Sequence, residues 1–323
     1  MRMTPKASFL AAAIAMAVVA PPTSAVVQDV TLAYKWTKGE TLRYRIDQKT
    51  DTTMSGLPGG MPDVTLNQVA NQVFKMTVDD LTADGVATLT QVFESMRMDF
   101  TTPAGKISVD SAAPNASASP PEQIAQKIFS AMVGEPFTIV LASSGKVEKL
   151  EGFTRMLDKV MASMPADPAA AAAFQQLKAG LSDDQMNAMF SQGFPQFPAK
   201  PIKPGDTWST TLTIPNPAVG GMITTVDYTL ASSDGQTARL TGKVKIEKDP
   251  KGPAVPGVMG MKTDLGTSNG DGEMVFDVAK GRLQTATTRM TMPMAVSGAA
   301  PDGTPVSMKM NVKSAVTIDL VEK

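Results

Sequence analysis

The chain has 323 residues, with 30 Lys and Arg against 31 Asp and Glu and a formal net charge of −1 at pH 7. This balance, without basic clusters, argues against nucleic acid and anionic membrane surfaces as partners. Because the chain contains neither cysteine nor histidine, it lacks disulfides, Ser-His-Asp catalysis and zinc–thiolate or imidazole sites, and we expect no cofactor and no bound metal.

The first 25 residues have the pattern of a secretory signal peptide. Arg2 and Lys6 precede an almost wholly apolar stretch, and small residues lead to a cleavage point after Ala25. We therefore expect an exported mature chain that begins at Val26, in the periplasm or outside the cell. No cysteine is present to carry a lipid, and no later apolar run is long enough for a transmembrane segment.

Residues 26–150 are predicted to form a first β unit. Apolar and polar residues alternate in three stretches, as in half-buried strands: residues 42–47, 74–79 and 96–100. Asp84-Gly85 is typical of a hairpin turn between the last two. We expect a polar loop over residues 101–118 and a central strand in the continuous apolar run at residues 137–141.

Helices are predicted in two places. Ser119 and Glu122 form a capping box for a helix that begins at Pro120. Residues 151–203 are predicted to be a helical connector, with three short helices followed by a proline-rich extended run at residues 195–204. We expect these helices to cover one face of a sheet, in preference to forming a movable lid over a cavity.

Residues 204–323 are predicted to form a second β unit. Alternation favours strands in six stretches: residues 208–214, 222–230, 238–246, 274–278, 290–294 and 306–320. The Gly- and Pro-rich residues 249–272 are predicted to be a mobile loop without a tightly bound metal. Pro293 indicates a sheet edge or a bulge within its strand.

The two β units share markers in the same order, which suggests an internal duplication. The pairs are Gly39-Glu40-Thr41 with Gly205-Asp206-Thr207, Asp84-Gly85 with Asp234-Gly235, and Gly145-Lys146 with Gly281-Arg282. About eleven or twelve strands are expected in all. The predicted fold is mainly β: two duplicated antiparallel units forming a large curved sheet or open barrel, with a helical insert between them. A β-sandwich is the alternative.

Several of these motifs together resemble a known family. They are Lys38-Gly39-Glu40-Thr41-Leu42-x-Tyr44, the Asp84-Gly85 hairpin, Ser143-Ser144-Gly145-Lys146-Val147 and Pro204-Gly205-Asp206-Thr207-Trp208. The pattern is similar to an uncharacterised family of exported bacterial β-rich proteins known only by a domain-of-unknown-function label. The resemblance implies an envelope location and supplies no catalytic residues. The expected architecture also resembles periplasmic lipoprotein carriers of the open-barrel type, as an analogy of shape alone.

Two polar motifs were weighed as sites. Ser143 and Lys146 match Ser-x-x-Lys, but that serine must open a helix, whereas here a turn between strands is expected. Asn269, Asp271 and Glu273 offer oxygen ligands for Ca²⁺ without the spacing of a dedicated loop, so a solvated segment is favoured.

Methionine is the outlying feature, with 23 Met against 12 Phe, 3 Tyr and 2 Trp. Four sets are spaced Met-x-Met, which places each set on one face of a strand: Met96 and Met98, Met259 and Met261, Met290, Met292 and Met294, and Met308 and Met310. Core filling, an adaptable lining for an apolar ligand and Cu(I) binding were weighed, in that order of preference. As candidate lining residues we take Met96, Met98, Met290, Met292, Met294, Met308 and Met310.

These observations favour a non-enzymatic exported β protein that binds or carries an apolar or amphipathic envelope component. The alternative is a structural or protein–protein interaction module of the cell envelope without a small-molecule ligand. A carboxylate-dependent hydrolase ranks third, because no pair of carboxylates has suitable spacing.

Overall fold

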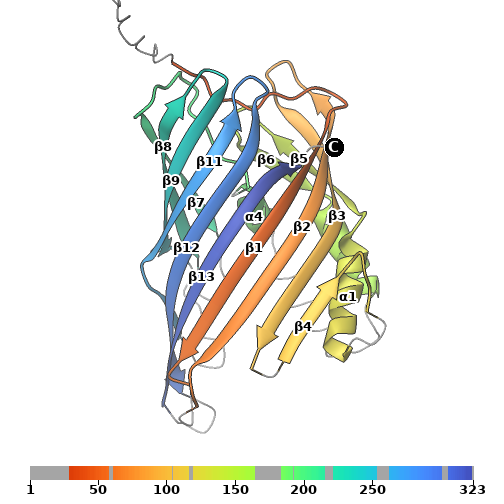
Figure 1. The fold of residues 1–323 in the computed structure, drawn as a ribbon, viewed down its shortest axis with the longest axis vertical. Coiled ribbons are helices and arrows are strands. Elements are labelled where there is room, and N and C mark those ends of the chain that lie inside the picture. Colours follow the sequence, from red (N-terminus) through yellow and green to blue (C-terminus); the bar gives the residue numbers. More distant parts are fainter. Residues whose placement is uncertain are drawn as a thin grey trace, which may run out of the picture.

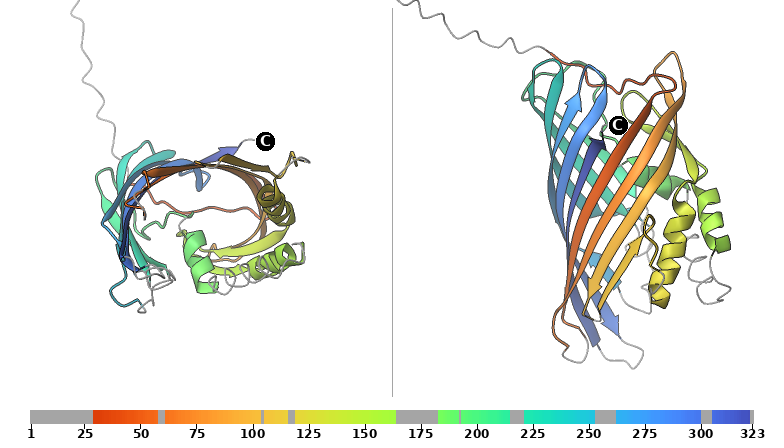
Figure 2. Two further views of the ribbon diagram at one scale, coloured as in Figure 1. Left: turned by 90° about the horizontal axis from the view of Figure 1, so that it is seen from below. Right: turned by 45° about the vertical axis from the view of Figure 1, so that its right-hand side comes forward.

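The computed structural model describes residues 29–57, 61–103, 105–115, 119–163, 183–191, 193–214, 221–252, 262–299 and 305–321. Within these ranges, thirteen strands form one antiparallel sheet and three helices lie together on one side of it (Figures 1 and 2). The sheet curls around a central space without closing, so the open barrel is confirmed and the sandwich is wrong. The predicted signal peptide lies outside the described residues.

The strands in chain order are β1 (Thr41–Ser55), β2 (Val64–Leu81), β3 (Ala87–Thr102), β4 (Gly105–Asp110), β5 (Pro136–Leu141), β6 (Val147–Glu151), β7 (Thr207–Ile214), β8 (Met222–Ser233), β9 (Thr237–Lys248), β10 (Lys262–Leu265), β11 (Ser268–Asp277), β12 (Arg282–Ala299) and β13 (Pro305–Val321). The helices are α1 (Pro120–Met132), α2 (Phe153–Ser163) and α4 (Asp183–Ser191). Across the sheet the order is β6-β5-β3-β2-β1-β13-β12-β11-β9-β8-β7, with β4 beside β3 and β10 beside β12. The pairing of β1 with β13 joins the two halves of the sequence.

Strict alternation of side chains gives the sheet one apolar and one polar face. In β9, Leu240 and Gly242 are buried inside the barrel, whereas Arg239 and Lys243 between them are exposed outside. An antiparallel sheet with one face on a core and one in water requires this pattern. On the neighbouring strands from β3 to β11, the inward positions of the described residues carry no charged side chain.

Two predicted loops are partly strands. Within residues 101–118, β4 pairs with β3, and within residues 249–272, β10 and the start of β11 pair with β12. The glycines that suggested a loop there lie in β11, where a Cβ on Gly270 would come within 2.7 Å of the carbonyl oxygen of Arg289. Glycine therefore marks a close approach of neighbouring backbones rather than a break in the strand.

Helix α4 bridges a gap in the sheet, whereas α1 and α2 contact each other and the strands β4 and β5. The α1 capping box is present, because the Ser119 N–H donates to Glu122 Oε2 at 2.8 Å. Two of the three helices predicted in the connector are α2 and α4, and the middle one lies outside the described residues. Helix α4 contacts both β6 and β7, the end strands of the sheet, which do not pair with each other (Figure 2).

An extended N-terminal segment, residues 29–38, crosses the interior of the barrel (Figure 2). Backbone hydrogen bonds hold it: Val30 bridges to Ile202, the Tyr34 N–H donates to Ser143 O at 2.7 Å, and the Lys35 N–H donates to Gly281 O at 3.1 Å. Gly281 has φ +60°, and a Cβ there would overlap the Lys35 backbone. The segment thus rests on the β5–β6 and β11–β12 turns.

The predicted marker pairs occupy matching places. Gly39 and Gly205 both have a positive φ. The Gly39 N–H donates to the Val78 carbonyl of β2, and the Val78 N–H donates to the Glu40 carbonyl. Gly205, Asp206 and Leu230 of β8 make the same two bonds. The strand order of the two halves also runs in the same direction across the sheet. The duplication itself stays a prediction.

Candidate apolar binding site

A cavity of about 260 Å³ lies between the N-terminal segment, the inner face of the sheet and the residues that follow α4. Fourteen described residues line it, and none of them is charged. Gln72 and Gln91 supply the side-chain amides, and almost all the other lining residues are aromatic or aliphatic. The cavity is therefore an apolar chamber with a few polar groups, as small-molecule sites usually are.

Strand register brings the sheet's share of the lining together. Tyr44 on β1 lies opposite Phe74 on β2, their rings stacked at 5.7 Å, and Phe74 lies opposite Phe93 on β3. One step along β1, Ile46 lies opposite Ile318 on β13. Because opposite residues of adjacent strands share one face, four strands contribute to the same wall.

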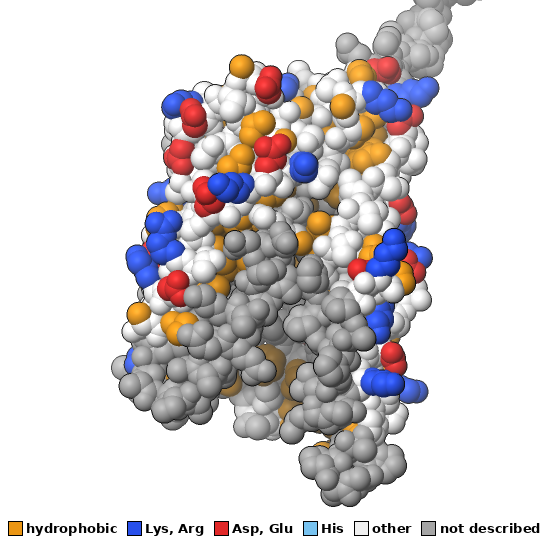
Figure 3. Space-filling model, turned by 180° about the vertical axis from the view of Figure 1, so that it is seen from behind, with side chains coloured by type: hydrophobic (Ala, Val, Ile, Leu, Met, Phe, Trp, Pro, Cys, Tyr) orange, Lys and Arg blue, Asp and Glu red, His pale blue; other side chains and the backbone are white. Residues whose placement is uncertain are grey.

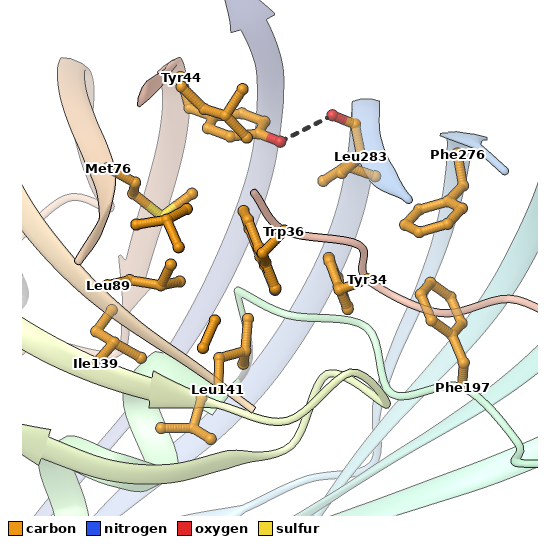
Figure 4. Packing of buried hydrophobic residues seen from close by; sticks show 14 of the residues in the cluster. Tyr34, Trp36, Tyr44, Met76, Leu89, Ile139, Leu141, Phe197, Phe276 and Leu283 are labelled. Atoms are coloured by element: carbon orange, nitrogen blue, oxygen red, sulfur yellow. Dashed lines mark hydrogen bonds between the residues drawn. The ribbon is translucent and has the colours of Figure 1, made fainter. Parts of the chain in front are cut away.

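The N-terminal segment closes one side of the cavity with an aromatic cluster (Figure 4). The ring of Tyr34 lies 5.9 Å from Trp36, 5.4 Å from Phe197 and 5.5 Å from Phe276, measured between ring centroids. These contacts join the segment to β11 and to the stretch after α4. Stacked and edge-on rings of this kind fix side-chain orientation as well as burying area.

The polar atoms of this cluster differ in their partners. Tyr44 Oη donates to the Leu283 carbonyl at 3.0 Å, the bond drawn in Figure 4. By contrast, Tyr34 Oη and Trp36 Nε1 are buried and have no hydrogen-bond partner among the described residues. Burial raises the pKa of Tyr34 well above its ordinary value, so its phenol stays neutral and able to donate.

The predicted methionines lie elsewhere on the inner face. Met96 belongs to the buried core at 7% exposure, whereas Met98, Met290, Met292, Met294, Met308 and Met310 are half-buried. In the β12–β13 pair, Met294 lies opposite Met310, and Arg289, Lys309 and Lys313 are exposed on the outer face. None of the seven lines the cavity. Met259 and Met261 lie outside the described residues.

Along β1 and β13, uncharged polar side chains lie between the cavity residues and the methionines Met54 and Met310. Gln48 Nε2 donates to Thr50 Oγ1 at 3.2 Å, and Thr50 Oγ1 lies 3.3 Å from Ser314 Oγ across the β1–β13 pair. Gln48 and Thr50 follow Ile46 and precede Met54 on the inward side of β1. On other strands the methionines reach the same rows, because Met96 lies opposite the cavity residue Gln72 and Met290 lies opposite Ser314.

The two polar motifs weighed as sites have structural roles. Ser143 and Lys146 lie at the β5–β6 turn, where the carbonyls of Ser143 and Ser144 accept the N–H groups of Tyr34 and Phe197. Asn269 and Asp271 are exposed on the outer face of β11, opposite Lys245 and Lys243. The described residues contain no group of three or more acidic side chains placed to hold a metal ion.

The N-terminal segment, residues 29–38, is outside every strand and site predicted from the sequence. Val30, Leu32, Tyr34 and Trp36 alternate with Thr31, Ala33 and Lys35, which is the period of an extended chain, and all four are buried. This alternation is visible in the sequence, but the stretch is short. The cavity residues that follow α4, such as Phe194, carry no comparable pattern.

Comparison with known protein families assigns the chain to one of them. Residues 84–283 match the family of unknown function DUF6263. The chain belongs to this family. The expectation of an uncharacterised family is thereby confirmed, and the match includes the helical connector and most of both β units of this DUF6263 protein.

Comparison with solved structures gives matches of low structural similarity, with TM-scores below 0.5. Lipovitellin, in a structure titled for lipid–protein interactions, has a TM-score of 0.45 at 9% identity, with 89% of this chain covered and 26% of that one. An outer membrane channel from Pseudomonas putida F1 has a TM-score of 0.23 at 8% identity, covering 93% and 99%. DynF from Micromonospora chersina scores 0.21 at 10% identity, covering 94% and 92%. The DUF6263 chain spans about a quarter of the lipovitellin chain.

No curated protein matches the sequence. Across the described ranges, no helix is both long and apolar enough to cross a membrane.

Proposed function

We propose that this DUF6263 protein binds an apolar or amphipathic small molecule inside its open barrel. The observation that carries the proposal is the cavity of about 260 Å³ with an uncharged, largely aromatic lining. An apolar cavity of about 150 Å³ is large enough to hold benzene. The larger chamber suits a short hydrocarbon chain or the apolar end of a longer molecule.

The proposed activity is binding without chemical conversion. The described lining residues include no serine, lysine, aspartate or glutamate. Nucleophilic and acid–base catalysis both need an ionisable group within hydrogen-bond reach of the substrate, and the lining tyrosines Tyr34 and Tyr44 stay neutral because burial raises the pKa of each. The signal-peptide pattern of residues 1–25 further places the ligand, in this proposal, among the components of the cell envelope.

The alternative of an interaction module has little support in the structure. A protein–protein surface is expected to expose a sizeable apolar patch. Among the described residues, the exposed large apolar side chains are Met61 and Val69. Acidic and basic side chains are interspersed over the described part of the face seen in Figure 3.

Filling the cavity tests the proposal. Ile318 lines the cavity from β13, whereas Ala315 on the same strand lies on the outer face. We expect Ile318→Trp to weaken binding of an environment-sensitive apolar dye by about tenfold or more, because the added ring occupies the chamber. The matched variant Ala315→Trp should leave dye binding unchanged. Circular dichroism confirms that both variants fold.

Two results would contradict the proposal. Wild-type protein that binds neither the dye nor short alkyl compounds at micromolar to millimolar concentration has no functional apolar chamber. Equal binding by wild type and Ile318→Trp places the dye elsewhere on the protein.

A further inference from the structure

Gln91 is a buried amide without a partner on the wall of the cavity. It lines the cavity from β3 and is only 5% exposed. Its side chain makes no hydrogen bond with any of the described residues. Buried amides in proteins are almost always hydrogen-bonded, so an exception of this kind points to a partner that enters the site.

The wall around Gln91 offers its amide no partner. On the inner face Gln91 lies opposite Met76 of β2 and Phe137 of β5, and Leu89 and Phe93 flank it along β3. All four neighbours are buried hydrophobic residues, and Met76 and Leu89 are labelled in Figure 4. None of these side chains is a donor or a strong acceptor, so the amide can find a partner only on its cavity side.

The amide of Gln91 is also open to the cavity, unlike the polar atoms of the aromatic cluster. Protein atoms close off Tyr34 Oη and Trp36 Nε1. Gln91 Oε1 and Nε2 are not among the enclosed unpaired atoms of the described residues. A molecule inside the cavity can therefore reach both atoms of this amide.

Gln72, the other amide of the lining, lies at a different place on the wall. It is half-buried and lies opposite Met96, whereas Gln91 lies opposite Met76. Gln72 and Met76 are about 13 Å apart along β2, at about 3.3 Å per residue. One head group of a ligand therefore meets only one of the two glutamines.

The lining limits the charge of that head group. None of the fourteen described lining residues is charged, so a carboxylate or an ammonium group would lose its hydration without gaining an opposite charge. A hydrocarbon avoids this loss but leaves both Oε1 and Nε2 of Gln91 unpaired. A primary carboxamide presents a C=O and an N–H side by side, as Gln91 does, so the two amides can exchange two hydrogen bonds.

We infer that Gln91 sets the specificity of the cavity by exchanging two hydrogen bonds with an uncharged ligand group that carries a donor and an acceptor side by side. The chemical class is a carboxamide on an apolar chain. The inference rests on the proposed function and names the head group that the cavity selects.

Matched eight-carbon compounds test this head group. Octanamide and N,N-dimethylhexanamide are isomers, but only octanamide can donate a hydrogen bond. Displacement of the apolar dye gives their affinities and that of octane for wild type, Gln91→Leu and Gln72→Leu. We expect the affinity ratio of octanamide to octane to fall about tenfold in Gln91→Leu, through loss of the buried hydrogen bonds, and to stay unchanged in Gln72→Leu. The ratio for N,N-dimethylhexanamide should fall less, because this isomer cannot donate to Gln91 Oε1.

A second measurement uses wild-type protein alone. The side-chain ¹⁵N–H signals of Gln91, assigned by through-bond connection to its backbone, report directly on its hydrogen bonds. We expect octanamide to move one of these proton signals downfield, whereas octane should not. The side-chain signals of Gln72 serve as the internal control.

The outcomes separate this inference from the proposed function. Equal ratios in wild type and Gln91→Leu, or Gln91 signals that octanamide leaves in place, overturn the inference, while binding of octane keeps the proposed function standing. A ratio that falls in Gln72→Leu instead places the head group at the other glutamine and also overturns it. Octanoate that binds as tightly as octanamide at neutral pH overturns the uncharged class. Failure of all these compounds to bind overturns the proposed function as well.

Discussion

Replacing Tyr34 by phenylalanine is expected to stabilise the ligand-free protein, although removal of a buried hydroxyl usually destabilises. The Tyr34 hydroxyl is buried and has no partner among the described residues. Tyr34→Phe removes that desolvation cost and keeps the ring contacts with Trp36, Phe197 and Phe276. We expect the free energy of unfolding to rise by about 1–2 kcal/mol, from the 1–3 kcal/mol cost of an unpaired buried group.

Tyr44→Phe is the matched control with the opposite sign. Tyr44 is as buried as Tyr34, at 5% exposure, but its hydroxyl donates to the Leu283 carbonyl at 3.0 Å. Its loss removes a buried hydrogen bond and should lower the free energy of unfolding by about 1–2 kcal/mol. Urea unfolding measures both changes as shifts of the midpoint at constant slope.

One result would refute this reasoning. If Tyr34→Phe destabilises ligand-free protein as much as Tyr44→Phe does, the Tyr34 hydroxyl is hydrogen-bonded in solution.

Three further outcomes are expected. Met292→Ser and Met310→Ser should each lower the free energy of unfolding by about 1 kcal/mol, since both side chains are only half-buried, and should weaken apolar-dye binding if these methionines extend the site. Gly281→Ala should release the N-terminal segment, detected as faster tryptic cleavage after Lys35, because a Cβ at Gly281 would overlap the Lys35 backbone. Backbone N–H groups of Ser108 and Ser119 lower the pKa of Glu122 below its ordinary 4.5. The stabilisation of α1 by this carboxylate is therefore present above pH 4.5 and is lost as the pH falls through the lowered pKa. An acid titration followed by circular dichroism measures this loss, with Glu122→Gln for comparison.

Matched positions provide the controls. Met96→Ser, in the buried core, should cost about 2–4 kcal/mol, and an equal cost at Met292 would show that Met292 also lies in dry core. Gly205 has φ +94° with nothing within 4 Å of a built Cβ, so Gly205→Ala should add only local backbone strain. Coincident acid transitions of wild type and Glu122→Gln would mean that the capping carboxylate contributes nothing.

The strands could be predicted because their two faces meet different surroundings. In β9, Arg239 and Lys243 alternate with Leu240 and Gly242, so the sequence shows the two-residue period of a strand with one buried face. The same holds for β12 and β13, where the Met-x-Met spacing predicts one shared face for each set and Met294 lies opposite Met310 in register. β4 and β10 were missed because each is short and flanked by residues typical of loops.

The cavity could not be predicted because its residues meet only through long-range pairing. Tyr34, Phe93, Phe190 and Leu283 lie far apart in the sequence and converge through the segment, the sheet and helix α4. No periodicity within one element encodes that meeting. The candidate methionines share the inner face with this cavity without lining it, and their role as a lining for an apolar ligand stays a prediction.

The gap between β6 and β7 affects how the circumference of the open barrel is set. In a closed barrel the hydrogen-bonded ladder sets the circumference, so widening it by one step requires a new strand or a new stagger. Here side-chain contacts of α4 with the two end strands take the place of that last ladder. Such contacts tolerate small sideways shifts that backbone pairing does not. Substitutions in α4 alone can therefore resize the interior for bulkier or slimmer ligands while every strand pair stays in register.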